Sequence, residues 1–138
     1  MAVLTSAEVN EQADLSYVRG TYYVALTLSS SEYTSGVSYS TIQSDEVTSG
    51  VGGYARLSYT YTAADLQAYS NGQPLAQKVA NFVHDGSSGN ITFNNVVLLR
   101  EVSGTYSVVG FERLAESATI ANGNYAKINI NILHGVVS

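Results

Sequence analysis

The chain has 138 residues, of which 45% are hydrophobic and only 12% are charged, and its net charge is −5. This length is typical of a single domain with its own core, and the hydrophobic content excludes a chain that is disordered throughout. The few Lys and Arg residues are scattered, which excludes the basic face of a nucleic-acid-binding protein. Cysteine is absent, which excludes disulfides, thiol catalysis and thiolate metal sites.

The sequence contains neither a membrane span nor a secretion signal. No stretch approaches the ~18 consecutive apolar residues of a transmembrane helix. Residues 1–12 lack the basic start and the apolar run of a signal peptide. We therefore expect a protein that is made in a cytoplasm and binds neither a membrane nor nucleic acid.

The first twenty residues differ in character from the rest. Thr5 and Glu8 fit a T-x-x-E capping box, which could start a short helix over residues 7–15. The alternative is an extended arm that becomes ordered against a neighbouring molecule, and both interpretations stay open. We treat residues 1–20 as an N-terminal arm and residues 21–138 as one domain.

The β signal begins directly after this arm. Residues 21–28 (TYYVALTL) alternate in the way of a half-buried strand. The residues expected on one face are Tyr22, Val24, Leu26 and Leu28. The polar stretch that follows, residues 29–53, is too long for an ordinary connection. It should contain a functional loop or a short strand, for which residues 37–43 (VSYSTIQ) are the candidate.

Residues 50–55 read GVGGYA and match G-x-G-x-x-A, the glycine fingerprint of dinucleotide-binding folds. Such a site needs a helix after the glycines, because the pyrophosphate binds at the helix N-terminus. Here the chain continues as RLSYTYT, whose apolar and aromatic residues alternate as in a strand. We therefore predict that Gly50, Gly52 and Gly53 form a turn with backbone angles that other residues avoid, and that no nucleotide cofactor binds.

The second half of the chain reads as one or two helical turns and several strands. The turn falls in residues 62–74, where a T-x-x-D cap precedes a Gly and a Pro. The strands are expected at residues 78–84, 91–99, 106–111, 118–120 and 125–133. The continuous apolar run Val96–Leu99 is typical of a strand covered on both faces. Residues 121–124 (ANGN) predict a hairpin turn before a strand in which Ile128, Ile130 and Ile132 share one face.

Seven or eight short strands without a long helix predict an all-β protein. The spacing of the strands, near ten residues, is typical of a β-sandwich or barrel, and we expect a jelly-roll or Greek-key β-sandwich.

Few residues could carry chemistry. His84 adjoins Asp85, but neighbouring side chains in a strand point to opposite faces, and no G-x-S-x-G motif accompanies the pair. The histidines do not have metal-ligand spacing. Asp45 and Glu46 lack the spacing of a calcium loop and are interpreted as a solvated loop. The sequence therefore predicts no catalytic site, no metal site and no cofactor.

Tyrosine is the compositional outlier, with 11 Tyr and no Trp. Tyr together with Ser, Gly and Asn is typical of recognition surfaces. Tyr22, Tyr59 and Tyr61 are expected in the core, because they alternate within strands. Tyr33, Tyr39 and Tyr69 occur in loop-like segments and are either interface residues or ordinary surface tyrosines. The arm adds six interface candidates, which are Val3, Leu4, Val9, Leu15, Tyr17 and Arg19.

Four blocks of sequence occur in the same order as in a known family. They are YYVALTLS (22–29), DEVTSGVGGYARLSYTY (45–61), GNITFNNVVLLRE (89–101) and IANGNYAKININI (120–132). With these blocks the chain resembles a family of tailed-bacteriophage virion proteins, and the EV…GVGGYAR block is the most specific. The resemblance implies a jelly-roll structural domain, found in tail-fibre-like or capsid decoration (cement) proteins, and implies no enzymatic activity.

The expected function is that of a capsid decoration protein on the virion surface. Its expected partners are the major capsid protein and further copies of itself, in a homotrimer. The alternative is a tail-fibre or baseplate component whose exposed tyrosines bind a host receptor or glycan. A small enzyme is a third interpretation, which the scarcity of titratable residues disfavours.

Overall fold

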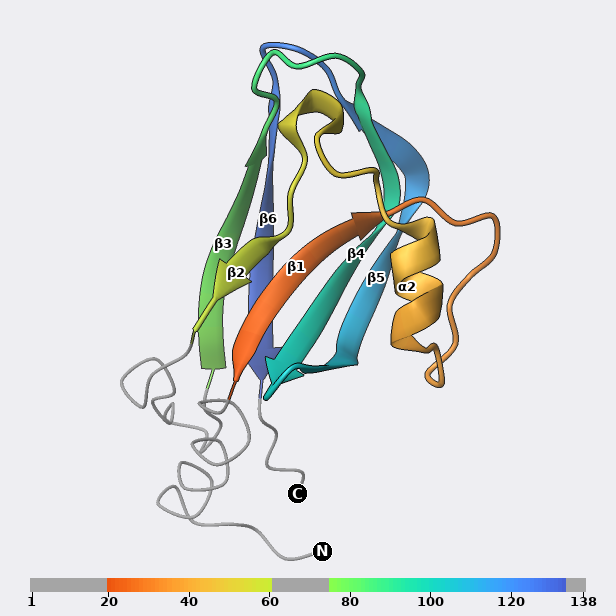
Figure 1. The fold of residues 1–138 in the computed structure, drawn as a ribbon, viewed down its shortest axis with the longest axis vertical. Coiled ribbons are helices and arrows are strands. Elements are labelled where there is room, and N and C mark those ends of the chain that lie inside the picture. Colours follow the sequence, from red (N-terminus) through yellow and green to blue (C-terminus); the bar gives the residue numbers. More distant parts are fainter. Residues whose placement is uncertain (1–19, 61–74, 134–138) are drawn as a thin grey trace, which may run out of the picture.

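The computed structural model of the protein describes residues 20–60 and 75–133 (Figure 1). Several sequence-based predictions lie outside these residues: the arm with its six interface candidates, the helical turn at residues 62–74, Tyr61, Tyr69 and His134.

Two antiparallel sheets make up most of the described structure, which confirms the prediction of an all-β protein. The larger sheet has the strand order β2-β1-β4-β5, and the smaller one pairs β3 with β6. The strands of the larger sheet are β1 (Thr21–Thr27), β2 (Leu57–Tyr59), β4 (Ile91–Val102) and β5 (Thr105–Ile120). The smaller sheet contains β3 (Leu75–Val83) and β6 (Tyr125–Leu133).

The main core lies between the two sheets. Val24 and Leu26 of β1 pack there with Phe93 of β4, against Phe82 of β3 and Ile130 of β6. The opposite face of the larger sheet carries a second apolar cluster, made by Ala25, Ile42, Val97 and Leu99. Strands β1 and β4 are therefore buried on both faces, which explains the continuous apolar run in β4 and confirms that prediction.

Residues 37–43 do not form the short strand that was predicted. Residues Tyr39–Asp45 form helix α2, and the side chain of Ser38 accepts a hydrogen bond from the Thr41 backbone N–H at 3.3 Å. This is an N-cap, a role that serine favours. Only Ile42 of the helix is buried, where it packs on the larger sheet. A single apolar anchor leaves no periodic pattern in the sequence, so the helix could not be predicted from alternation.

Residues 106–111 and 118–120 are strand residues, as predicted, but they belong to the one long strand β5 and not to two separate strands. The hairpin prediction was wrong, because the turn at residues 121–124 joins β5 to β6 in the other sheet. The hairpin between β4 and β5 turns at Ser103 and Gly104, whose φ angles are 51° and 83°. Positive φ at both central residues suits the right-handed twist of a two-residue hairpin. Leu28 follows the end of β1 and is exposed, so it does not extend the buried face.

Asn94 completes the pairing of the chain after β1 ends. The register of β4 and β5 shifts at this residue, between Phe93 and Asn95. The Asn94 Oδ1 atom accepts the backbone N–H of Ser29 at 2.9 Å, and Asn94 Nδ2 donates to the Ser29 carbonyl at 2.8 Å. The side-chain amide therefore takes the place of a strand backbone at the register shift.

Substitution Asn94→Ala is expected to lower the free energy of unfolding by about 2 kcal/mol, because it leaves two buried backbone groups of Ser29 without partners. Urea denaturation measures this change. Asn90→Ala, at an exposed loop position, is the matched control and should change stability by less than about 0.5 kcal/mol. An equal loss in both variants would contradict the role given to the Asn94 amide.

Candidate functional site

The strongest polar cluster in the described residues centres on Glu46 and Arg56. Glu46 follows helix α2 and pairs with Thr27 at the end of β1, while Arg56 directly precedes β2. Arg56 Nη2 donates to Glu46 Oε1 at 2.7 Å, and Arg56 Nε donates to Glu46 Oε2 at 2.9 Å. This is a two-pronged ion pair, and the two side chains are only 19% and 14% exposed. The interpretation of Glu46 as part of a solvated loop was therefore wrong.

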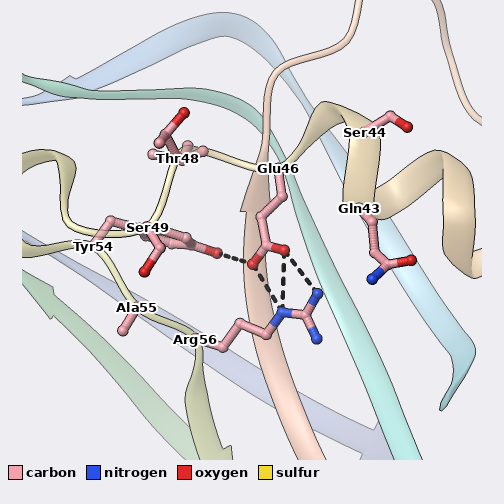
Figure 2. Close-up of a pocket in the computed structure, with 9 residues that line it drawn as sticks. Gln43, Ser44, Glu46, Thr48, Ser49, Tyr54, Ala55 and Arg56 are labelled. Atoms are coloured by element: carbon pink, nitrogen blue, oxygen red, sulfur yellow. Dashed lines mark hydrogen bonds and ion pairs between the residues drawn. The ribbon is translucent and has the colours of Figure 1, made fainter. Parts of the chain in front are cut away.

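Tyr54 holds the second oxygen of the same carboxylate. Its hydroxyl donates to Glu46 Oε2 at 2.7 Å (Figure 2). The same hydroxyl accepts the Leu26 backbone N–H at 3.0 Å. Burial raises the pKa of the Tyr54 hydroxyl far above its usual range, and the neighbouring Glu46 carboxylate raises it further. Hydrogen bonds to Glu46 likewise raise the pKa of Arg56. Tyr54 therefore stays neutral and Arg56 stays positively charged.

Aromatic rings extend the cluster on the side of helix α2. Arg56 Nη1 donates to the Tyr39 hydroxyl at 2.8 Å, and its guanidinium carbon lies 5.3 Å from the centre of the Tyr39 ring. The Tyr39 and Tyr106 rings stack with centroids 4.7 Å apart, and Tyr23 lies at a tilt against Tyr106. Contacts of a cation with aromatic faces add about 0.5–1 kcal/mol each at such sites.

A polar hollow of about 570 Å³ adjoins the ion pair. Gln43 and Ser44 of helix α2 line it together with Thr48, Ser49, Glu46 and Arg56 (Figure 2). These groups offer hydroxyl and amide hydrogen bonds without net charge, because the two ionised side chains neutralise each other. The hollow suits an uncharged, hydroxyl-rich ligand better than an anion.

The glycine turn and the His84–Asp85 pair, singled out separately in the sequence, are in contact. Gly52 accepts a hydrogen bond from Asp85 N at 3.1 Å and donates to the Ser88 carbonyl at 3.2 Å. A side chain at Gly52 would begin 2.7 Å from the His84 ring. The three glycines have φ angles of 89°, 57° and 80°, and a strand follows them, which confirms the prediction of a glycine turn.

His84 and Asp85 form hydrogen bonds to backbone groups of the loop that follows them, residues 86–89, next to the glycine turn. His84 is buried, and its Nε2–H donates to the Gly89 carbonyl at 2.7 Å while Nδ1 accepts the Gly86 N–H at 3.1 Å. Asp85 is exposed and accepts the Ser87 N–H at 2.8 Å, and hydrogen bonds from Ser87 lower the pKa of the Asp85 carboxyl. Both ring nitrogens of His84 are thus occupied by backbone groups.

Tyr33 and Tyr39, the two tyrosine interface candidates within the described residues, both make contacts inside the fold. Tyr39 begins helix α2 and contacts Arg56, so its assignment to a loop was wrong. Tyr33 lies in the loop before α2, where its hydroxyl donates to Asp45 Oδ2 at 2.9 Å and its ring meets Phe111 edge-on. Both are half-buried. Tyr22 is fully buried and Tyr59 packs on the main core, as predicted.

Sequence reasoning missed the Glu46–Arg56 pair. The two residues stand ten positions apart on either side of the glycine turn, and no local periodicity joins them. Only the turn itself brings them together, so the available signal was the presence of one Glu and one Arg flanking a glycine-rich segment.

Comparison of the chain with protein-family models, with curated proteins and with solved structures finds no match. Among the residues that the structure describes, no helix is long and apolar enough to cross a membrane. The same residues contain no group of three or more His, Cys, Asp or Glu side chains that could hold a metal ion. The fold and the site thus define an all-β protein of two antiparallel sheets with an ion pair, Glu46–Arg56, at its main polar cluster.

Proposed function

We propose that the protein is a non-enzymatic structural protein of a phage virion, most specifically a capsid decoration protein that binds and stabilises the shell of major capsid protein. We further propose that its two sheets belong to the jelly-roll class, as the sequence resemblance implies. In this role the protein binds the shell and further copies of itself, as a homotrimer.

One contrast among the described residues carries this proposal: the main polar side chains bond to partners within the fold, while apolar side chains are exposed on a strand surface. Glu46, Arg56 and His84 are engaged within the fold. In contrast, apolar side chains stand on the surface of the smaller sheet: Val83 and its cross-strand partner Tyr125 are 55% and 61% exposed, and Val79 is similarly open. A protein with little charge and exposed apolar strand residues is suited to association with other proteins.

Binding to an assembled shell stabilises it by mass action, because a ligand that binds only the assembled state favours that state. The arm, residues 1–20, supports this role, because its sequence contains apolar residues and precedes β1. In our proposal the arm contacts neighbouring subunits.

Deletion of residues 2–18 is expected to lower the affinity for phage heads at least tenfold, because the arm supplies contacts between subunits. Heads that lack the decoration protein are titrated with the full chain and with the deletion variant, and bound protein is measured after sedimentation. Circular dichroism of the deletion variant controls for folding. Unchanged occupancy of the heads by a folded deletion variant would show that the arm does not contribute to binding.

A second candidate function, recognition of a glycan by a tail component, is favoured by one observation. Tyr39, which stacks on Tyr106, contacts Arg56, and Arg56 lines the polar hollow. Aromatic rings near hydroxyl and amide groups are suited to sugars. A glycan array tests this candidate, and an array without any bound glycan would reject it.

A further inference from the structure

Within residues 20–60 and 75–133, one side of the larger sheet is uncovered. The larger sheet has four strands and the smaller sheet has two, so among these residues part of the larger sheet has no strand opposite it. An apolar groove of about 290 Å³ runs between β5 and β6 at this side. Among the residues that line it are Val96, Leu98, Gly110, Glu112, Ile128 and Ile130. In the part of the chain that the structure describes, the groove therefore exposes part of the main core.

Both walls of the groove are strand edges. Among the described strands, β5 pairs only with β4, and β6 pairs only with β3. The outer edge of each strand thus presents backbone N–H and C=O groups that can pair with a further strand. An incoming extended segment would find backbone hydrogen bonds at the edges and apolar contacts in the groove, which is the chemistry of strand addition.

Gly110 leaves room in the groove for such a segment. It pairs with Leu98 across the β4–β5 ladder, so a side chain at this position would share the inner face with Leu98. A Cβ atom added at Gly110 would meet nothing within 4 Å. Glycine in the interior of a strand often marks the close approach of another backbone.

The occupant must be apolar, extended and close to the open side. Residues 1–19 precede β1 and contain Val3, Leu4, Val9, Leu15, Tyr17 and Val18. Strand β1 begins at the end of the sandwich where β6 ends (Figure 1). Nineteen extended residues span up to roughly 60 Å. A domain of this size is about 35–40 Å across, so the segment can reach an adjacent copy.

We propose that the groove between β5 and β6 binds residues 1–19 of an adjacent copy as an additional strand. This inference rests on the proposed function, which places copies side by side on a shell, and it names the surface that receives the arm. Insertion into a neighbour covers the exposed core and also links the copies. Insertion into the groove of the same chain would cover the core without linking anything.

Cross-linking between two differently substituted proteins tests the proposal. One protein carries Val9→Cys and the other Glu112→Cys, and the native chain contains no cysteine, so the introduced thiols are the only ones. The two proteins are mixed in equal amounts, treated with a short bifunctional maleimide, and the linked peptides are identified by mass spectrometry. Leu4→Cys and Leu15→Cys repeat the experiment along the arm.

We expect a link between the arm of one chain and position 112 of the other. Gln43→Cys, on the exposed side of helix α2, replaces Glu112→Cys as the control and should give a yield at least tenfold lower. A third protein carries both Val9→Cys and Glu112→Cys, and a link that forms within this protein but not between the two singly substituted proteins would overturn the assignment to an adjacent copy. Absence of any arm–groove link would overturn the groove as the binding site.

A groove-filling variant provides a second measurement. Gly110→Leu places a side chain in the empty space and is expected to lower the yield of the arm–groove link at least tenfold. Gly36→Leu is the matched control, because Gly36 also has nothing within 4 Å of its Cβ position and lies in an exposed loop. Thermal melting of both variants confirms folding, and an undiminished link in folded Gly110→Leu would overturn the proposal.

The two proposals fail in different ways. Saturable binding to heads without an arm–groove link would leave the decoration role standing and reject the groove. A link between copies in solution without binding to heads would keep the groove and reject the decoration role.

Discussion

Replacement of Gly52 by alanine is expected to lower the free energy of unfolding by about 3 kcal/mol. Gly52 has φ 57°, in the left-handed region that costs other residues roughly 1–2 kcal/mol. The new Cβ atom would also lie 2.7 Å from His84 Cδ2 and 3.0 Å from Ile91 Cγ1. His84 is fixed by two hydrogen bonds to backbone groups, so it cannot move without losing them, and such overpacking costs about 1–3 kcal/mol.

Urea denaturation followed by circular dichroism measures this loss. Gly36→Ala is the matched control, because Gly36 has neither a positive φ angle nor a neighbour within 4 Å of its Cβ position. We expect the control to change stability by less than about 1 kcal/mol, in either direction. A Gly52→Ala protein as stable as the control would contradict the structural role of the GVGG turn.

Removal of the Arg56 side chain is expected to lower the free energy of unfolding by about 3 kcal/mol, which is the second large effect. Arg56→Ala leaves the Glu46 carboxylate mostly buried with Tyr54 as its remaining side-chain donor. An ionised group that loses its charged partner in a buried site typically costs 3–5 kcal/mol, and the partial exposure of this pair places it at the lower end. The stacked Tyr39 also loses its hydrogen-bond donor.

Two further variants separate charge from geometry. Arg56→Lys keeps the charge but not the two-pronged contact, so an intermediate loss of about 1–2 kcal/mol is expected. In the double variant Glu46→Gln with Arg56→Met, neither charge remains. Its loss of stability should be smaller, by about 1–3 kcal/mol, than the sum of the losses caused by Glu46→Gln alone and by Arg56→Met alone. Strict additivity in this double-mutant cycle would show that the pair is not coupled.

The strands that the sequence predicted best are those with a clear pattern of burial. β1, β4 and β6 were recognised because alternation or a continuous apolar run reports directly on which faces are covered. The glycine turn was recognised because positive φ angles demand glycine. These features depend on a few neighbouring residues, and local sequence therefore determines them.

The errors occurred where distant contacts decide the structure. Helix α2 has a single buried anchor, Ile42, whose partners lie in β1 and β4. The Asn-Gly turn has hairpin chemistry, but β6 pairs with β3, more than forty residues earlier, because burial of Ile128 and Ile130 against the larger sheet stabilises that arrangement. The contact of His84 with Gly52 and the Glu46–Arg56 pair are likewise products of the tertiary fold, without a signal in local sequence.

Counting the copies that bind to purified phage particles tests the proposed function most directly. Protein is mixed with decoration-free heads and, separately, with tails, and the bound copies per particle are measured after sedimentation. We predict saturable binding to heads at a copy number that scales with the subunits of the shell, and no binding to tails. Binding to tails alone, at a few copies per particle, would contradict the decoration role and favour a receptor-binding tail component.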